Sequence, residues 1–185
     1  TGSTRVQGAK NAVLPIMAAS VLSGGETVLH NVPDLRDVTT TLRILQHLGC
    51  TAVRDGDTVR IDSRGMHCDF IPHALMRELR SSVIFLGAIL ARFGTARLSM
   101  PGGCELGPRP VNLHLDALRA LGAEVTERGG DIICRAHALQ GRRILLPFPS
   151  VGATENAMLA ACAAAGETVI CNAAREPEIA DLQCY

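Results

Sequence analysis

The chain has 185 residues, of which 47% are hydrophobic, so it is long enough to bury one sizeable core and short for two. Its 18 basic and 18 acidic residues give a formal net charge of zero, which excludes a global attraction to nucleic acid or to a membrane surface. Any anion site must therefore be local. The chain shows neither a secretory signal pattern nor an apolar run of about 18 residues, so we expect a cytoplasmic protein without a membrane segment.

The chain contains seven cysteines, an odd number, with no CxxC pair and no zinc-type histidine spacing. Neither a disulfide scaffold nor a metal site is predicted, and no cofactor is expected. Most of these cysteines, such as Cys134 and Cys162, lie among alanine, isoleucine or valine. They are interpreted as core residues in a reducing compartment.

The first predicted elements are, in chain order, a helix at 10–21, a glycine turn at 23–25, a strand at 27–29, a loop at 31–34, a second helix at 38–48 and a hairpin at 51–61. The first helix carries Val13, Ile16 and Met17 at helical spacing. Gly49 ends the second helix, and Asp55-Gly56 is the predicted hairpin turn.

The same order of elements then recurs: a helix at 80–92, a turn at 94, a strand at 96–100, a loop at 101–110, a second helix at 111–121 and a hairpin at 124–135. A third copy begins with a helix at Ala153 and continues through a turn at Gly166, a strand at 168–171 and a loop at 172–177. This copy stops inside its second predicted helix, at Tyr185, and its closing hairpin is missing from the chain. The period is about 70 residues.

This repetition predicts an α/β domain with pseudo-threefold repeated units, at about residues 8–66, 77–139 and 150–185, of which the third is incomplete. Strands that alternate with helices favour parallel pairing. The loops at 31–34, 101–110 and 172–177 follow equivalent strands, so we expect them to gather at one end of the domain, where functional loops usually lie.

Cys104 lies in the loop at 101–110, which is rich in glycine and proline and also carries Arg109. Partial exposure and a nearby cation lower a thiol pKa and make it a usable nucleophile or acid. The residues leave open a second interpretation, in which Cys104 fills a gap in a tight loop.

Three further positions open predicted helices and are candidates for anion binding. Lys10 and Asn11 begin the first helix, where free N–H groups attract anions and a cation is unfavourable by ~0.3–1 kcal/mol without one. Arg80 begins the corresponding helix of the second unit, although it also fits an ordinary charged surface turn. Ser150 and Thr154 flank the start of the third, where capping of the helix explains either hydroxyl equally well.

Five motifs in order resemble those of the UDP-N-acetylglucosamine enolpyruvyl transferases: GAKNA (8–12), LRSS (79–82), PGGC with GPRP (101–104 and 107–110), SVGAT (150–154) and NAAREPE (172–178). The resemblance covers essentially the whole chain. It implies an inside-out α/β barrel, no cofactor, and transfer of the enolpyruvyl group of phosphoenolpyruvate to the 3-hydroxyl of UDP-N-acetylglucosamine. In that family this reaction releases phosphate and is the first committed step of peptidoglycan synthesis.

The resemblance also implies roles for individual residues. Cys104 would protonate the methylene carbon of phosphoenolpyruvate and would be the thiol that fosfomycin attacks, with Lys10 as a second catalytic residue. Lys10 and Asn11 would contact phosphoenolpyruvate, and Arg80 and Arg109 would contact phosphates. The uridine site would be lined by Pro110, Val111, Asn112, Leu113, Ser150 and Val151.

The sequence departs from the family pattern at Asn112, which is often aspartate, and at Phe148, which is lysine in some members. The family also has a second domain that supplies a catalytic aspartate and further arginines, so this chain alone is expected to bind weakly and to turn over little or nothing. Two alternatives stay open. One is the related enolpyruvyl shikimate-phosphate synthase, which does not use a loop cysteine. The other is a non-catalytic domain that retains the uridine site.

Overall fold

The structure is a computed structural model that describes residues 1–3, 6–79, 81–100 and 111–185. The first group of elements comprises α1 (Lys10–Ala19), η1 (Ser20–Leu22), β1 (Glu26–Leu29), α2 (Arg36–His47), β2 (Thr51–Asp55) and β3 (Thr58–Asp62). The second comprises β4 (Phe70–Ile71), α3 (His73–Glu78), η2 (Ser82–Ile84), α4 (Phe85–Phe93), β5 (Thr95–Ser99), α5 (Asn112–Ala120), β6 (Glu124–Arg128) and β7 (Asp131–Arg135). The third comprises β8 (Arg143–Leu145), α6 (Val151–Ala161), β9 (Val169–Cys171) and α7 (Pro177–Cys184).

The order helix, strand, helix and hairpin occurs in the first two groups, and its first three elements occur in the third. The predicted repeated α/β architecture is confirmed. The predicted helix ends at Gly49 and Gly122 are also correct, since both glycines have a positive φ just after a helix. Within the predicted glycine turn at 23–25, Gly24 is the residue with a positive φ.

The strands form three small sheets in the orders β1-β3-β2, β4-β5-β7-β6 and β8-β9. Parallel pairing is confirmed only for β4 with β5 and for β8 with β9. It was wrong for β1, which pairs antiparallel with β3, and β5 pairs antiparallel with β7 on the side opposite β4. The reason is that each of these strands pairs with the second strand of the hairpin that follows its crossover helix, and that strand runs in the opposite direction.

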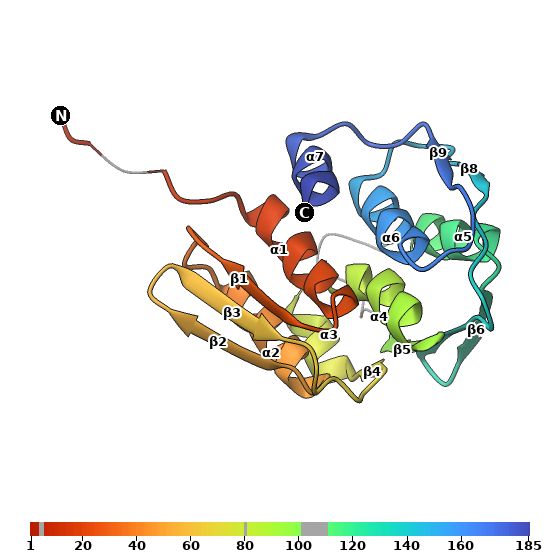
Figure 1. The fold of residues 1–185 in the computed structure, drawn as a ribbon, viewed down its shortest axis with the longest axis horizontal. Coiled ribbons are helices and arrows are strands. Elements are labelled where there is room, and N and C mark those ends of the chain that lie inside the picture. The colour runs from red at the N-terminus through yellow and green to blue at the C-terminus, as the bar shows by residue number, and fades with distance from the viewer. Residues whose placement is uncertain (4–5, 80, 101–110) are drawn as a thin grey trace.

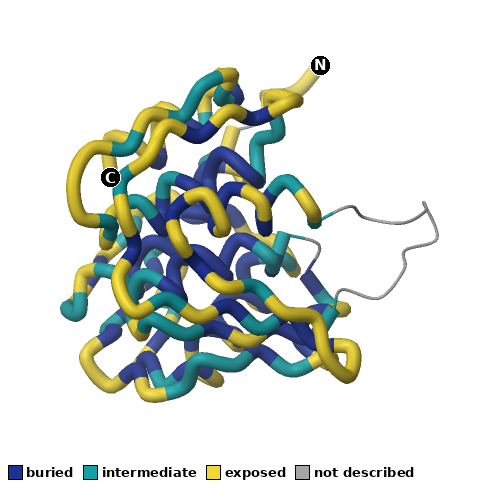
Figure 2. The backbone as a smooth tube through the Cα atoms, turned by 90° about the vertical axis from the view of Figure 1, so that its right-hand side faces the viewer, coloured by how far each residue is buried: buried dark blue, intermediate teal, exposed yellow. Residues whose placement is uncertain are grey.

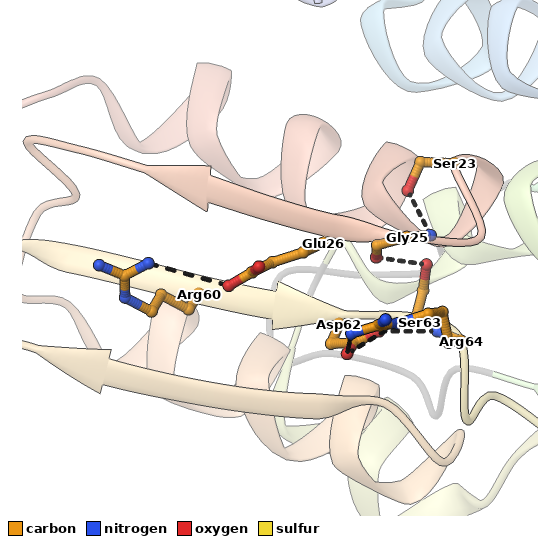
Figure 3. A network of polar contacts seen from close by, with 7 residues as sticks. All are labelled: Ser23, Gly25, Glu26, Arg60, Asp62, Ser63 and Arg64. Atoms are coloured by element: carbon orange, nitrogen blue, oxygen red, sulfur yellow. Dashed lines mark hydrogen bonds and ion pairs between the residues drawn. The ribbon is translucent and has the colours of Figure 1, made fainter.

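Polar contacts join the end of β3 to the start of β1 (Figure 3). The Ser63 amide donates to the Gly25 carbonyl over 3.0 Å, and the Ser63 hydroxyl donates to the same oxygen over 3.2 Å. Arg60 and Glu26 form an exposed ion pair across the two strands. The Arg64 guanidinium holds the pKa of Asp62 down to about 2. The Ser63–Gly25 and Arg60–Glu26 contacts join β3 to β1, whereas the Asp62–Arg64 pair lies at the end of β3.

Helices form the inside of the domain and the sheets lie outside them (Figure 1). Helix α4 packs against α1 and α6 and is buried continuously over residues 85–90, as expected for a helix surrounded by protein. The strands bury one face only: Val59 and Ile61 are fully buried on β3, while Arg60 between them is exposed. The buried positions accordingly concentrate in the centre of the molecule (Figure 2).

Of the two cysteines named above as core residues, Cys134 is fully buried on β7 and Cys162 is exposed. The interpretation of Cys162 was therefore wrong. It follows the last turn of α6 and borders a hollow of about 940 Å³ between α6, α7 and η1. Alanine-rich flanks are compatible with a helix terminus as well as with a core.

Gly87 sets the close approach of α4 to α6. A Cβ at this position would lie 2.4 Å from the backbone oxygen of Asn156, which cannot move without shifting α6. We expect Gly87→Ala to destabilise the chain by about 2 kcal/mol or more, despite the better helix propensity of alanine. Urea denaturation checks this.

The matched control is Gly25→Ala, where a new Cβ meets nothing within 4 Å and the backbone φ is negative. This variant should stay within about 0.5 kcal/mol of wild type. Equal stabilities for the two variants would contradict the tight packing of α4 on α6.

Candidate active site

A cleft of about 410 Å³ lies where the N-terminal turns of several helices meet. It is lined by Lys10, Asn11, Leu14, Pro15, Asp37, Ser81, Val83, Ile84, His114, Val151, Gly152, Glu155 and Glu178. Lys10 opens α1, Val151 opens α6, and Asp37, His114 and Glu178 lie in the first turns of α2, α5 and α7. Free N–H groups at helix N-termini favour anions, so the cleft suits a negatively charged ligand.

Lys10 is half exposed, and its Nζ lies 3.1 Å from Oδ2 of Asp37. The unfavourable position of a cation at the start of α1 is thus offset by a carboxylate of α2. This contact weakens the sequence argument that Lys10 requires a bound anion. The lysine still lies at the cleft, where its ammonium can contact both a ligand anion and the carboxylate of Asp37.

Asn11 connects α1 to α7, because its Nδ2 donates to Oε1 of Glu178 over 3.3 Å. This hydrogen bond joins residues 167 positions apart in the sequence. It brings a residue of the GAKNA motif into contact with one of the NAAREPE motif. Both residues line the same cleft.

Glu155 lies on α6 and is only 6% exposed. Burial and, to a smaller extent, the nearby carboxylate of Glu178 together raise the pKa of its carboxyl to about 8. Glu155 is accordingly held largely protonated at neutral pH. This state reduces the negative charge that an anionic ligand would meet in the cleft.

The two hydroxyls at the start of α6 have hydrogen-bond partners within the protein, and that of Ser150 caps the helix. The Ser150 Oγ accepts from the Ala153 amide over 3.4 Å, and the Ser150 carbonyl accepts from the Thr154 hydroxyl over 2.8 Å. The Thr154 oxygen also accepts from the Ala174 amide over 3.0 Å. Both hydroxyls therefore have structural partners, and that of Thr154 also joins α6 to the segment before α7.

The structure brings Lys10, Asn11 and Val151 together at the cleft, whereas Ser150, Val111, Asn112 and Leu113 do not line it. Val111 caps α5, Asn112 is exposed and Leu113 packs partly against the core. The predicted residues Arg80, Cys104, Arg109 and Pro110 lie outside the described residues.

The two described loops, at 31–34 and 172–177, lead into α2 and α7, whose first-turn residues Asp37 and Glu178 both line the cleft around Lys10, as expected of loops that gather at one end of the domain. The loop residues themselves border other clefts. Asn31, Val32 and Asp34 border a separate cleft of about 400 Å³, and Asn172, Arg175 and Glu176 border another. Helix N-termini, rather than these loops, line the cleft around Lys10.

Sequence reasoning missed His114, Glu155 and Asn156, which are all buried. One signal was available for two of them: Glu155 and Asn156 stand as adjacent polar residues inside an alanine-rich helix, where a side chain that faces the core needs a polar partner. His114 had no comparable signal, because a single histidine on a mixed helix is common on surfaces.

The described residues contain neither a candidate metal site nor a candidate membrane-spanning helix. No group of three or more histidine, cysteine or acidic side chains is placed there to hold a metal ion. None of the helices described is both long and apolar enough to cross a bilayer.

Fold and cleft together define a mixed α/β domain of repeated units with a cleft at its helix N-termini. The chain belongs to the EPSP synthase (3-phosphoshikimate 1-carboxyvinyltransferase) family, whose model matches residues 1–184. The solved enolpyruvyl transferase NikO from Streptomyces tendae has a TM-score of 0.87 at 22% identity, covering 100% of this chain and 43% of that one. An EPSP synthase from Acinetobacter baumannii has a TM-score of 0.67 at 21% identity, covering 91% and 40%. These two likenesses concern the fold.

Relatives of higher identity carry a more specific name. UDP-N-acetylglucosamine 1-carboxyvinyltransferase 2 of Caldanaerobacter subterraneus subsp. tengcongensis is 50% identical over 184 residues, covering 100% of this chain and 44% of the relative. UDP-N-acetylglucosamine 1-carboxyvinyltransferase of Halorhodospira halophila is 48% identical over 182 residues, covering 98% and 44%. The chain thus spans less than half the length of these relatives.

Proposed function

We propose that the full-length protein containing this chain transfers the enolpyruvyl group of phosphoenolpyruvate to the 3-hydroxyl of UDP-N-acetylglucosamine and releases phosphate. The names of the relatives at about 50% identity support this substrate pair over 3-phosphoshikimate. The structural observation that carries the proposal is the cleft that joins Lys10, Asn11 and Val151 at the N-termini of α1 and α6.

In the proposed reaction, Lys10 and the N-terminal turns of α1 and α6 bind the anionic groups of the substrates. Departure of phosphate and the developing positive charge on the reacting carbon both require fixed charges and dipoles around the site. Asn11 is held by Glu178, so its amide is positioned beside Lys10 before a ligand enters. The neutral carboxyl of Glu155 keeps additional negative charge out of the cleft.

The other roles in the proposal rest on the sequence motifs. Cys104 protonates the methylene carbon of phosphoenolpyruvate, since a weakly basic enol ether needs a positioned acid. Arg80 and Arg109 contact phosphates. The residues of the uridine site are Pro110, Val111, Asn112, Leu113, Ser150 and Val151.

The proposal includes the organisation of the whole protein. The repeated units at about residues 8–66, 77–139 and 150–185 form one domain, and a second domain completes the active site across the cleft. The 185-residue chain by itself is then expected to have little or no activity. We also propose a cytoplasmic location, because the six described cysteines are free thiols, which a reducing compartment preserves.

Fosfomycin treatment of the full-length protein tests the role of Cys104. Mass spectrometry of the digested protein should find one fosfomycin adduct, on Cys104, and phosphate release should require both phosphoenolpyruvate and UDP-N-acetylglucosamine. The matched control is Cys162→Ser, which removes an exposed thiol outside the Lys10 cleft and should leave the adduct unchanged.

Labelling at another residue, or none, contradicts the role of Cys104. Labelling without phosphate release favours a non-catalytic domain that retains the uridine site. Phosphate release with shikimate 3-phosphate in place of the nucleotide sugar favours the related shikimate enzyme. The experiment therefore separates the three candidate functions.

A further inference from the structure

Asn156 is a fully buried polar residue at the centre of the helix layer, and its side chain contacts three other elements. Its Oδ1 accepts from the Gly87 amide of α4 over 2.7 Å. Its Nδ2 donates to the Val83 carbonyl of η2 over 2.9 Å and lies 2.7 Å from Nδ1 of His114 on α5. All the hydrogen-bonding groups of this amide are therefore directed at α4, η2 and α5.

These contacts determine which ring nitrogen of His114 carries the proton. A backbone N–H can only donate, so the Asn156 atom that meets Gly87 is the oxygen and the other atom is the NH₂ group. One hydrogen of that group is directed at the Val83 carbonyl, which can only accept, and the other at His114. Nδ1 of His114 must then accept with its lone pair, and the proton resides on Nε2.

The Cε1–Nε2 edge of the imidazole faces Gly152, which lines the cleft together with His114. His114 is one of its lining residues and is 9% exposed. A Cβ at Gly152, in the first turn of α6, would lie 2.8 Å from Cε1 and 3.3 Å from Nε2 of the ring. Among the described residues Nε2 has no hydrogen-bond partner, so it is a donor at the N-terminus of α6 that a ligand can use.

Burial lowers the pKa of His114 to about 4, which keeps the ring neutral at physiological pH. The charged and titratable groups that line the same cleft are Lys10 of α1, Asp37 of α2, Glu155 of α6 and Glu178 of α7. The hydrogen bond from Asn156 favours the same neutral ring, because a protonated Nδ1 would oppose an N–H group.

We propose that Asn156 is a positioning residue that holds His114 as its neutral Nε2–H tautomer, so that the ring presents a hydrogen-bond donor to an oxygen of an anionic ligand bound at the start of α6. The ligand part of this proposal rests on the proposed function, in which the cleft binds phosphorylated substrates. The tautomer part depends only on the contacts of Asn156.

Nitrogen-15 NMR of the histidine-labelled full-length protein tests the tautomer. The His114 signals, assigned by their loss in His114→Gln, should show the neutral Nε2–H pattern between about pH 5 and pH 8. In Asn156→Asp, a carboxylate replaces the NH₂ donor and favours a proton on Nδ1. The ring should then be doubly protonated over much of this range.

Several results would overturn the proposal. A neutral Nδ1–H pattern, or averaging of both tautomers in the wild-type protein, contradicts the role of Asn156 even if the aspartate variant does not fold. A folded Asn156→Asp variant whose His114 titrates as in wild type does the same. Asn172→Asp is the matched control, since this amide lies outside the cleft, and it should leave the His114 spectrum unchanged.

The ligand part is tested with inorganic phosphate as the probe. Titration should shift the His114 Nε2–H signal and should leave the tautomer unchanged, and no shift at saturating phosphate contradicts the donor role. Failure of the proposed function would instead appear as absent phosphate release with the nucleotide sugar. The two failures are therefore distinguishable.

Discussion

Lys10→Ala in the full-length protein is expected to lower kcat/KM for phosphoenolpyruvate about 100-fold or more. Lys10 stands at the N-terminus of α1 inside the cleft, and its ammonium is the cation that α1 supplies there. In the proposed reaction, its loss removes a charge-assisted hydrogen bond to a substrate oxygen. Steady-state phosphate release with both substrates measures the effect.

The unfolding free energy of Lys10→Ala distinguishes a loss of catalysis from a loss of folded protein. The Lys10–Asp37 pair is partly exposed, so breaking it should cost at most about 1 kcal/mol of unfolding free energy. The matched control is Arg43→Ala, which removes the cation of the Arg43–Glu78 ion pair outside the cleft and should leave kcat/KM within about threefold. If Lys10→Ala retains activity like this control, Lys10 serves only as the partner of Asp37.

Glu155→Gln is expected to abolish most of the fall in unfolding free energy that the wild-type chain shows as the pH rises from about 6.5 to about 8. The folded-state pKa of Glu155 is about 8, against an ordinary value of 4.5, because the carboxyl is buried and lies near Glu178. Between these two values the unfolded chain ionises while the folded chain keeps its proton. The stabilisation is thus fully present below pH 4.5 and is lost as the pH rises through 8, by up to about 5 kcal/mol.

His114 acts in the opposite direction and limits stability at acid pH. Its folded-state pKa is about 4, against an ordinary value of 6.5, so its contribution is present above pH 6.5 and is lost as the pH falls toward 4. From these two residues together, we expect a plateau of maximum stability between about pH 4.5 and pH 6.5.

Urea denaturation across this pH range measures the Glu155 prediction. The unfolding free energy of wild type should fall from about pH 6.5 to pH 8, whereas that of Glu155→Gln should stay nearly level. Glu124→Gln, a change of an exposed carboxyl on β6, is the control and should follow wild type. Parallel profiles for wild type and Glu155→Gln would show that Glu155 ionises in the folded chain much as it does in the unfolded one.

Much of the fold follows from local sequence. The helix ends at Gly49 and Gly122 require a left-handed residue, and the turns of both hairpins contain glycines with positive φ. These signals act over a few residues and do not depend on the rest of the chain. Strand pairing is different, because the partner of β1 is chosen by the path of a hairpin more than 20 residues away.

Some features of the candidate site also follow from local sequence, and others depend on tertiary packing. The sequence by itself determined the repeated α/β order and placed Lys10 and Asn11 at a helix N-terminus, because short-range propensities and caps decide where helices start and end. Only the tertiary structure decided that Lys10 pairs with Asp37, that Asn11 meets Glu178, and that Asn156 reaches His114. The pKa of Glu155 and the tautomer of His114 depend on what surrounds each side chain. Those surroundings come from α4, α5, α6 and α7, which only packing brings together.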